Sequence, residues 1–317
     1  MTSPAETAPV WVLADPRAGT AAQALGVAEA LGAPFRVLPL GWSPLARLPL
    51  PWPSLAGLSA QSRAGFMPPW PRLVISAGRR AAPAALWLGA RGAATVHCMR
   101  PGFGAGRFSL LVLGEHDQPA PAANVFPILG AAHRMGLARL AAARAEFAEL
   151  GALPGPRVAL LVGGPVKQAS QGLEPELVAG LARAAAALGG SVMATTSRRT
   201  GAAAHAALVQ ALAGTPHRVF GWGDAGTNPY AGFLAWADVV VVTGDSVSML
   251  SEALATPAPV FVAELPAGRR HALLWQSLYA AGHARPLARP LGAGLFSRAA
   301  LDETGRVAAE IRARGLL

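Results

Sequence analysis

The segment that most constrains the fold is a run of four valines, Val239 to Val242, that stops at a glycine and is followed by helix-capping residues. A short β-branched run that leads into a helix start predicts a buried parallel strand followed by a helix N-terminus. Either Asp245 or Ser246 can cap that helix. Ser248 and Glu252 lie four residues apart, so they share one of its faces.

Two interpretations of this segment are open. A hydroxyl in the first turn of a helix lies beside free backbone N–H groups and the positive end of the helix dipole, where a phosphate binds readily. Glu252, one turn further on, can accept hydrogen bonds from the two hydroxyls of a ribose. Alternatively, Ser246 and Ser248 only cap the helix, and Glu252 is a solvated carboxylate.

The pattern of strand, polar loop and helix repeats along the chain and restarts at Leu153-Pro154-Gly155-Pro156. Since 317 residues exceed the usual size of one hydrophobic core, two domains are expected. We predict an α/β protein of two doubly wound Rossmann-type domains that face a central cleft, with residues 1–153 and 154–296. A helix from about Ser297 to Arg314, within 297–317, is expected to pack back toward the first domain.

Each predicted domain has its own set of elements. Strands are expected at 10–14, 35–40, 73–77, 95–99, 108–113 and 124–127, and then at 157–162, 191–196, 218–220, 238–242 and 260–263. The main helices are expected up to residue 32 and at 81–89, 134–150, 174–188 and 270–281.

Charge and cysteine content narrow the possible partners. The formal charge is +10, from 27 basic and 17 acidic residues. The arginines are scattered, so no nucleic-acid groove is indicated, but anionic partners are favoured. Cys98 is the single cysteine, which fits a reducing compartment and excludes a cysteine metal site. With neither a secretory signal nor a membrane-spanning run, we expect a cytoplasmic protein, or one peripheral to the inner face of the cytoplasmic membrane.

Polar residues after strands of the first half are candidates for acid–base chemistry. Asp15 follows the first strand, at the sheet edge where open α/β sheets bind ligands. His116 and Asp117 follow a later strand, where a histidine can act as a general base. A surface histidine without a role is the alternative for His116.

Polar residues after strands of the second half are candidates for nucleotide binding. Gly163 and Gly164 let backbone amides approach an anion, and Lys167 can reach it as a point charge. The spacing is not that of a P-loop. Further candidates at strand ends are Arg198, Arg199, Asn228 and Tyr230.

Residues 41–71 differ from the rest because prolines interrupt a stretch that contains Trp42, Trp52, Phe66 and Trp70. Tryptophan and arginine on an apolar segment suit a membrane interface or a groove for a lipid-linked acceptor. A hydrophobic loop packed on its own domain is the alternative.

The arrangement resembles the GT-B glycosyltransferases, in which the second domain holds the nucleotide of a sugar donor. More specifically, the chain resembles the mitochondrial-fission elongated-mitochondria protein family, which is GT-B-like. The resemblance spans about 10–287 and rests on the segments DPRAGTAAQALGVAEALG, ISAGRR, EHD, SRRT, NPY and TGDSVSMLSEA. Where the family's first loop usually reads Asp-Gly-Arg-Pro-Gly-Asn, this chain keeps Asp15, Arg17 and Gly19 but has different residues between them.

The resemblance implies roles for the candidate residues. Glu252 would bind ribose; Ser246, Ser248, Gly163, Gly164 and Lys167 would hold the diphosphate, with Arg198 or Arg199 as further cations. Asp15 is the first choice for the base that activates the acceptor, and His116 with Asp117 the second. No metal or cofactor is expected, since the nucleotide-diphosphate sugar would be a substrate and a lipid-linked or membrane-surface molecule the acceptor.

Two other functions remain open. The chain can be a catalytically silent adaptor that uses residues 41–71 to recruit a partner or dock on a membrane, since plant members of the family act in organelle division. It can also be a nucleotide-sugar epimerase.

Overall fold

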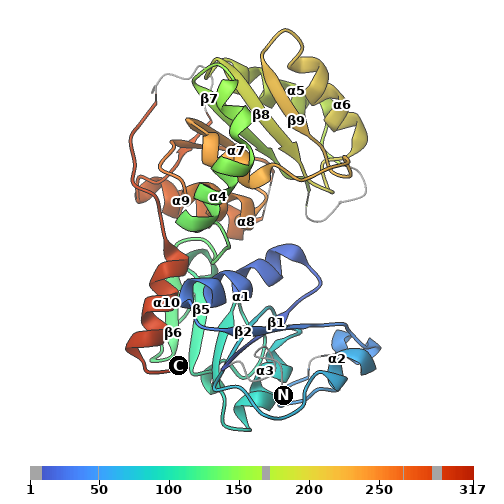
Figure 1. Ribbon diagram of the computed structural model, residues 1–317, viewed down its shortest axis with the longest axis vertical. Coiled ribbons are helices and arrows are strands. Elements are labelled where there is room, and N and C mark those ends of the chain that lie inside the picture. Colours follow the sequence, from blue (N-terminus) through green and yellow to red (C-terminus); the bar gives the residue numbers. More distant parts are fainter. Residues whose placement is uncertain (1–8, 49, 166–171, 267, 288–294) are drawn as a thin grey trace. The chain divides into compact units, whose positions relative to one another are not determined.

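The computed structural model describes residues 9–48, 50–165, 172–266, 268–287 and 295–317 (Figure 1). The chain forms two compact units. The first contains the residues up to Arg134 together with Asp302–Leu317, and the second contains Met135–Leu301.

The first unit is built on a six-stranded parallel sheet of order β2-β1-β3-β4-β5-β6. Its strands are β1 (Val10–Ala14), β2 (Phe35–Pro39), β3 (Leu73–Ala77), β4 (Ala94–Cys98), β5 (Leu110–Gly114) and β6 (Val125–Ile128). One face is covered by α1 (Ala18–Leu31) and α10 (Glu303–Ala313), and the other by α3 (Ala82–Gly89) and the segment around α2 (Ala60–Ala64). Because apolar side chains fill both faces, the strands are continuous hydrophobic runs.

The second unit repeats this architecture with a parallel sheet of order β12-β11-β10-β7-β8-β9. Its strands are β7 (Arg157–Val162), β8 (Ser191–Thr196), β9 (His217–Phe220), β10 (Val239–Thr243), β11 (Val260–Ala263) and β12 (Arg285–Pro286). Its helices are α4 (Leu137–Glu146), α5 (Pro175–Ala186), α6 (Ala202–Ala211), α7 (Tyr230–Trp236), α8 (Val247–Leu254) and α9 (Arg269–Ala280). The valines of β10 are fully buried at the centre of this sheet.

Each sheet has one point where the strand order reverses. In the first unit β1 lies between β2 and β3, and in the second β10 lies beside β7. The two strands on either side of such a switch point send their loops in opposite directions, which leaves a crevice at their carboxyl ends. The prediction of two doubly wound parallel sheets is confirmed, and the switch points identify where each unit can hold a ligand.

Three predicted boundaries differ from the structure. The long helix expected at 134–150 is split at Phe147 into α4 and the 3-10 helix η4 (Ala148–Ala152). Since α4 packs against α7, residues 135–153 belong to the second unit by contact and not to the first. The C-terminal helix begins at Glu303 and not at Ser297, because Asp302 caps it by accepting a hydrogen bond from the Gly305 amide at 2.8 Å.

The C-terminal helix α10 packs on α1, within the first unit. The remaining 3-10 helices are η1 (Pro44–Arg47), η2 (Ala105–Arg107) and η3 (Glu115–Asp117). No helix in the described ranges is long and apolar enough to cross a membrane.

Candidate functional site

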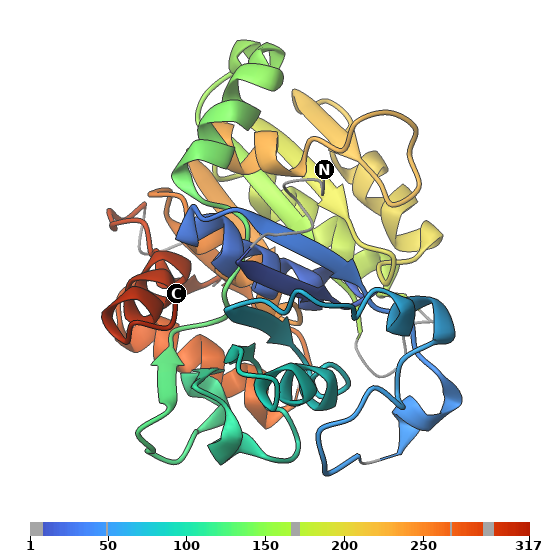
Figure 2. The ribbon, with the colours of Figure 1, turned by 60° about the horizontal axis from the view of Figure 1, so that its bottom comes forward.

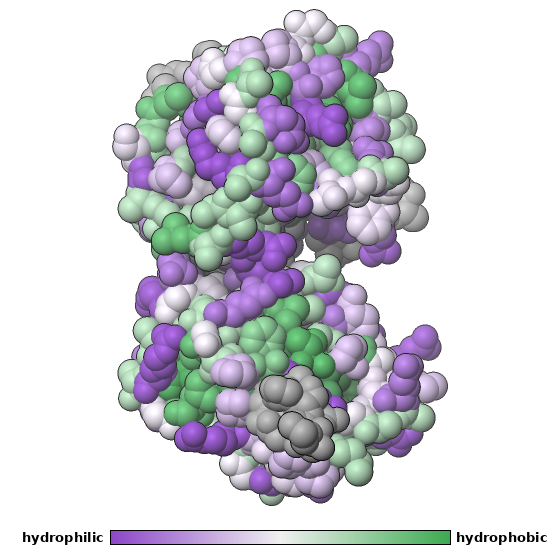
Figure 3. Space-filling model, viewed as in Figure 1, coloured by the Kyte–Doolittle hydropathy of each residue, from purple (hydrophilic) through white to green (hydrophobic). Residues whose placement is uncertain are grey.

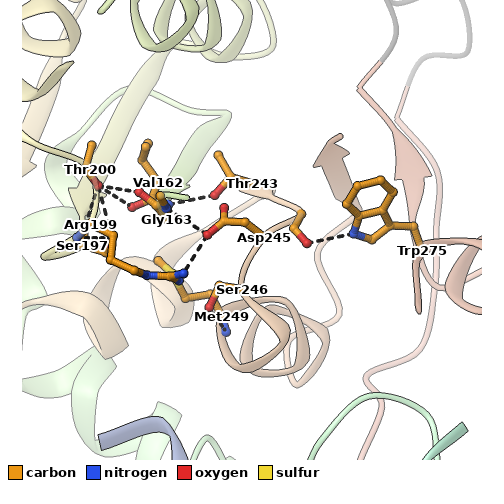
Figure 4. A network of polar contacts seen from close by, with 12 residues as sticks. Val162, Gly163, Ser197, Arg199, Thr200, Thr243, Asp245, Ser246, Met249 and Trp275 are labelled. Carbon is orange, nitrogen blue, oxygen red and sulfur yellow. Dashed lines mark hydrogen bonds and ion pairs between the residues drawn. The ribbon is translucent and has the colours of Figure 1, made fainter. Parts of the chain in front are cut away.

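Asp245 organises the switch point of the second unit (Figure 4). It follows β10 directly, and only 5% of its surface is exposed. Its Oδ2 accepts hydrogen bonds from the Gly164 amide at 2.8 Å and from the Arg199 guanidinium at 3.2 Å. One carboxylate therefore joins the loops that follow β7, β8 and β10. A buried carboxylate must be paired in this way to remain ionised.

The two residues after β7 are glycines because their neighbours leave no room for a side chain. A Cβ on Gly163 would lie 2.4 Å from Asp245 Oδ2, and one on Gly164 would lie 2.3 Å from the Arg199 carbonyl oxygen. The Gly163 amide donates to Thr243 Oγ1 at 2.7 Å. Both glycine amides are thus hydrogen-bonded within the chain. The structure corrects the idea that they point at an incoming anion: the absent side chain of Gly163 makes room for Asp245, and that of Gly164 makes room for the backbone of Arg199.

The loop after β8 is fixed by its own hydroxyl groups. Thr200 donates to the carbonyl oxygens of Val162 at 3.1 Å and Gly163 at 2.6 Å, and it accepts a hydrogen bond from the Ser197 amide. This holds Arg199 against Asp245 (Figure 4). Arg198 beside it is exposed, so the two predicted cations have different surroundings.

Helix α8 starts at the same point and is held at both ends. Ser246 is the residue that caps it, accepting a hydrogen bond from the Met249 amide at 3.3 Å. At its far end the guanidinium of Arg298 donates to the carbonyl oxygens of Ala253 and Leu254. Burial lowers the pKa of Arg298 to about 10. A cation at the C-terminal end complements the helix dipole and fixes the direction in which the N-terminus points.

Glu252 contacts Tyr230, as the sequence did not foresee. The Tyr230 hydroxyl, at the start of α7, donates to Glu252 Oε2 at 2.6 Å. Burial raises the pKa of Glu252 to about 7, although the hydrogen bond from Tyr230 and the nearby Arg139 lower it. Burial and the Glu252 carboxylate raise the pKa of Tyr230. Both side chains remain partly accessible, so Oε1 and the second lone pair of Oε2 can still accept hydrogen bonds from a diol.

Two further groups beside this site were missed from the sequence. Arg139, an exposed residue of α4, is close enough to Glu252 to lower its pKa. His271, in the first turn of α9, lies against Asp245; burial lowers its pKa, Arg270 lowers it further, and Asp245 opposes both. The sequence signal for His271 was its place in the segment that follows the fifth strand of this unit, β11.

The other predicted nucleotide-binding residues are distributed more widely. Asn228 is exposed, and its Oδ1 accepts a hydrogen bond from the Tyr230 amide at 3.0 Å, which forms the turn that precedes α7. Ser248 lies half-buried in the first turn of α8, one turn from Glu252. Lys167 lies outside the described residues.

In the first unit, Asp15 is held by its own loop. Its Oδ1 accepts hydrogen bonds from the Arg17 amide at 2.8 Å and the Arg17 Nε at 3.0 Å, and Oδ2 accepts one from the Arg17 guanidinium at 3.1 Å. The Asp15 side chain is 1% exposed and that of Arg17 61% exposed. Arg17 thus occupies both oxygens of this buried carboxylate, which is the geometry of a loop brace.

The second pair of acid–base candidates is also built into the fold. His116 lies in η3 and is 4% exposed, under Gly114, where a Cβ would come within 2.2 Å of the ring. The backbone carbonyl of the neighbouring Asp117 accepts a hydrogen bond from Arg100. His116 is therefore buried and not on the surface, and its role as a base stays a prediction.

The aromatic segment 41–71 of the first unit, whose backbone is drawn in the lighter blues of Figure 2, divides into two groups by the burial of its side chains. Phe66 and Trp70 pack edge-on against Trp11 at 6.4 and 6.2 Å between ring centroids, so part of the segment covers the domain's own core. Trp52 remains 56% exposed, as do Leu48 at 56% and Leu45 at 46%. Figure 3 shows apolar and hydrophilic residues side by side on the visible face of this unit.

The carboxyl edge of the second sheet carries groups that can bind a polyanion joined to a diol. A helix N-terminus lies there with the cations Arg199 and Arg270 from two other loops and with the imidazole of His271. One helical turn away is Glu252, whose carboxylate oxygens accept hydrogen bonds, one of them from the Tyr230 hydroxyl at 2.6 Å. Phosphates bind the first kind of group and sugar hydroxyls the second.

Comparison with known proteins agrees with the fold. Among solved structures, UDP-GlcNAc 2-epimerase from Methanocaldococcus jannaschii is similar with a TM-score of 0.54 at 11% identity, over 96% of this chain and 99% of that one. MurG from Acinetobacter baumannii aligns with a TM-score of 0.48 at 14% identity, over 97% and 91% of the two chains. The two parallel sheets have the GT-B architecture of nucleotide-sugar enzymes.

Sequence comparison identifies the family. The mitochondrial fission protein ELM1 of Arabidopsis thaliana is 39% identical over 145 residues, which are 45% of this chain and 34% of the plant protein. The match therefore spans about a third of that relative. The model of the family described as mitochondrial fission ELM1 matches residues 18–315. The chain belongs to the mitochondrial fission ELM1 family.

Proposed function

We propose that the second unit binds the nucleotide diphosphate of a sugar donor, and that the protein transfers the sugar to an acceptor at a membrane surface. The observation that carries the proposal is the pairing of Tyr230 with Glu252 one turn below the N-terminus of α8, at the switch point of the sheet. Glu252 follows Ser248 by about one helical turn, about 5.4 Å along the axis, so the group that accepts hydrogen bonds from the diol lies close to the phosphate-binding N-terminus of α8.

The residues take the following roles in this proposal. Glu252 accepts hydrogen bonds from the ribose, with Tyr230 holding its carboxylate in place. The amides of the first turn of α8 and the hydroxyl of Ser248 bind the diphosphate, Arg198 and Arg199 supply positive charge, and the His271 imidazole, whose pKa burial lowers, can donate a hydrogen bond. In a transfer the oxygen of the acceptor hydroxyl bonds to the anomeric carbon, the bond from that carbon to the diphosphate breaks, and the hydroxyl proton passes to a base or to water. The cations stabilise the leaving diphosphate.

A thermal-shift screen with UDP-, GDP-, ADP- and CMP-sugars tests donor binding. A ligand at about 100 times its Kd stabilises the native state by about 2.7 kcal/mol and raises the melting temperature by several degrees. Glu252→Ala should abolish the rise and Tyr230→Phe should reduce it. Glu176→Ala, which removes an exposed carboxylate of the same unit, is the matched control and should leave it unchanged. If no nucleotide stabilises the unaltered protein, the proposal is wrong.

A second candidate function is supported by the first unit. Both oxygens of Asp15 are occupied by Arg17, and His116 is buried. A protein without an available base would bind a nucleotide without turnover, as expected of an adaptor, and the relative with 39% identity is named for mitochondrial fission. Release of free nucleoside diphosphate, measured with a range of acceptors once a binding donor is known, separates the two. Binding without release favours the adaptor.

A further inference from the structure

The first unit contains a pocket of its own. It is formed between the segment that follows β2, the start of α3 and the loop after β4, and its cavity volume is about 140 Å³. The Ser54 amide donates to the Pro83 carbonyl at 3.1 Å, which fixes the first of these segments to the helix. The lining residues that the argument uses are Leu48, Leu50, Leu58, Phe103, Arg79 and Arg80.

The walls and rim of the pocket are apolar. Leu58 forms its floor and is 1% exposed, whereas Leu48 and Phe103 on the rim are each 56% exposed. Large apolar side chains that gather around a hollow lower their free energy when a ligand covers them. A cavity of this size is below the roughly 300–1,000 Å³ of pockets that enclose a drug-sized molecule. It has room for a short apolar segment.

Positive charge lies at one side of the same pocket. Arg79 and Arg80 follow β3, at the switch point between β1 and β3. Among the residues that the structure describes, neither guanidinium forms an ion pair. The stem of Arg79 packs against Gly102, where a Cβ would lie 2.9 Å from it. The N-terminus of α3, which starts two residues after Arg80, adds the positive end of a helix dipole.

We propose that this pocket binds an amphiphile with a phosphate head and an aliphatic chain. The phosphate binds Arg79 and Arg80, and the first part of the chain enters the cavity while the rest lies over Leu48 and Phe103. Charge complementarity selects this occupant. Two guanidinium groups without a carboxylate partner among the described residues, one of them 6.0 Å from the Trp42 ring centroid, lie beside an apolar hollow and favour an anion attached to an apolar group. Neither a free phosphate nor a neutral lipid uses both halves of the site.

The position of the pocket gives it a place in the proposed reaction. Gly78 precedes the two arginines, and a Cβ on it would lie 3.7 Å from the Arg17 guanidinium that holds Asp15. A head group bound by Arg79 and Arg80 therefore lies next to the loop after β1, where an acceptor hydroxyl would be expected. That the amphiphile is the acceptor rests on the proposed function, whereas its binding does not.

Isothermal titration calorimetry without any nucleotide tests the binding. The probe is decyl phosphate below its critical micelle concentration, compared with decanol and inorganic phosphate. We expect decyl phosphate to bind at least about tenfold more tightly than either, since it alone forms charge-assisted hydrogen bonds and buries apolar area. Arg79→Ala and Arg80→Ala should each weaken it by about tenfold, and Leu48→Asn by several-fold.

Matched controls come from the same unit. Arg63→Ala removes another exposed arginine, and Met67→Asn removes an apolar side chain that is 60% exposed, both outside the pocket. Neither should change the affinity. Equal affinity for inorganic phosphate, equal affinity for decanol, or equal losses in the control variants would overturn the proposal. Because nucleotide is absent, failure here leaves donor binding intact, and failure of donor binding leaves this pocket intact.

Discussion

The two units use the same architecture at their switch points but organise them differently. In the second unit Asp245 joins three loops, with Gly164 and Arg199 as partners from two neighbouring strand ends. In the first unit Asp15 is held by Arg17, two residues along the same loop. A long-range network around one carboxylate couples three loops of the second unit, whereas the carboxylate of Asp15 is hydrogen-bonded within its own loop. Arg79 and Arg80, in the loop after the neighbouring strand β3, form no ion pair among the described residues.

The difference suggests a division of roles. Coupled loops give a rigid edge, which suits recognition of a constant group such as a nucleotide diphosphate. In the first unit the carboxylate braces one loop alone, so the neighbouring loops can vary without disturbing that brace, which suits an acceptor side. If the second edge is rigid because of Asp245, substitutions there should affect stability more than their counterparts in the first unit.

Asp245→Ala should have the largest effect. It removes the partner of the Arg199 guanidinium, whose side chain is only 24% exposed, and leaves the Gly164 amide without its acceptor. Breaking a buried ion pair from one side destabilises by about 3 kcal/mol. Urea unfolding followed by circular dichroism measures the loss. The control is Asp224→Ala, which removes an exposed aspartate that accepts one amide hydrogen bond; a loss as large in this control would contradict the special role of Asp245.

Gly164→Ala should follow, at about 2 kcal/mol, because overpacking forces the backbone to move. The new Cβ would lie 2.3 Å from the Arg199 carbonyl oxygen, which cannot retreat while Arg199 is paired with Asp245. Gly136→Ala is the matched control, since no atom lies within 4 Å of a Cβ there. If both variants unfold at the same urea concentration as the unaltered protein, the loops are not tightly coupled.

Glu252 gives the second unit a pH dependence. Its pKa is about 7 in the folded protein against a usual value of 4.5, so between these values the native state binds a proton that the unfolded state does not. Its contribution to stability is therefore complete below about pH 4.5 and is lost as the pH rises through 7. Between pH 5 and pH 8 this amounts to on the order of 1–2 kcal/mol, allowing for partial exposure.

Comparison with Glu252→Gln isolates this group. His97, whose pKa is lowered to about 3 by burial, and His133, lowered to about 4, act in the opposite direction and lose stability as the pH falls below 6.5. These histidines are present in both proteins, so their effects cancel in the difference between the two unfolding curves. A difference that does not change from pH 5 to pH 8 would show that Glu252 titrates normally.

Local sequence predicted the sheets but not the contacts between their loops. The valines of β10 and the capping residues after them determine strand, turn and helix by short-range preferences. The partners of Asp245 come from positions 164 and 199, and that of Glu252 from position 230. Such pairs depend on strand order, which no local pattern contains. For the same reason Gly163 and Gly164 were interpreted as an anion-binding loop, whereas they leave room for Asp245 and for the backbone of Arg199.

The C-terminal segment shows the same limit. Apolar periodicity predicted a helix from Ser297. In the structure Arg298 donates to carbonyl groups at the end of α8, and the helix begins only after its capping residue Asp302. A long-range interaction of one arginine overrides the helical tendency of six residues.

The smallest effects should come from replacing Arg17 or Arg199 by lysine, which keeps the positive charge but loses the planar guanidinium with its several donors. Arg17→Lys should destabilise by about 0.5 kcal/mol, because the Arg17 amide still donates to Asp15 and the side chain is largely exposed. Arg199→Lys should cost about 1–2 kcal/mol, since a single ammonium cannot follow the guanidinium geometry in a mostly buried site. Urea midpoints of the two variants test the comparison directly. A loss in Arg17→Lys equal to that in Arg199→Lys would mean that both switch points are braced alike, and the proposed division between a rigid donor edge and an adaptable acceptor edge would have no physical basis.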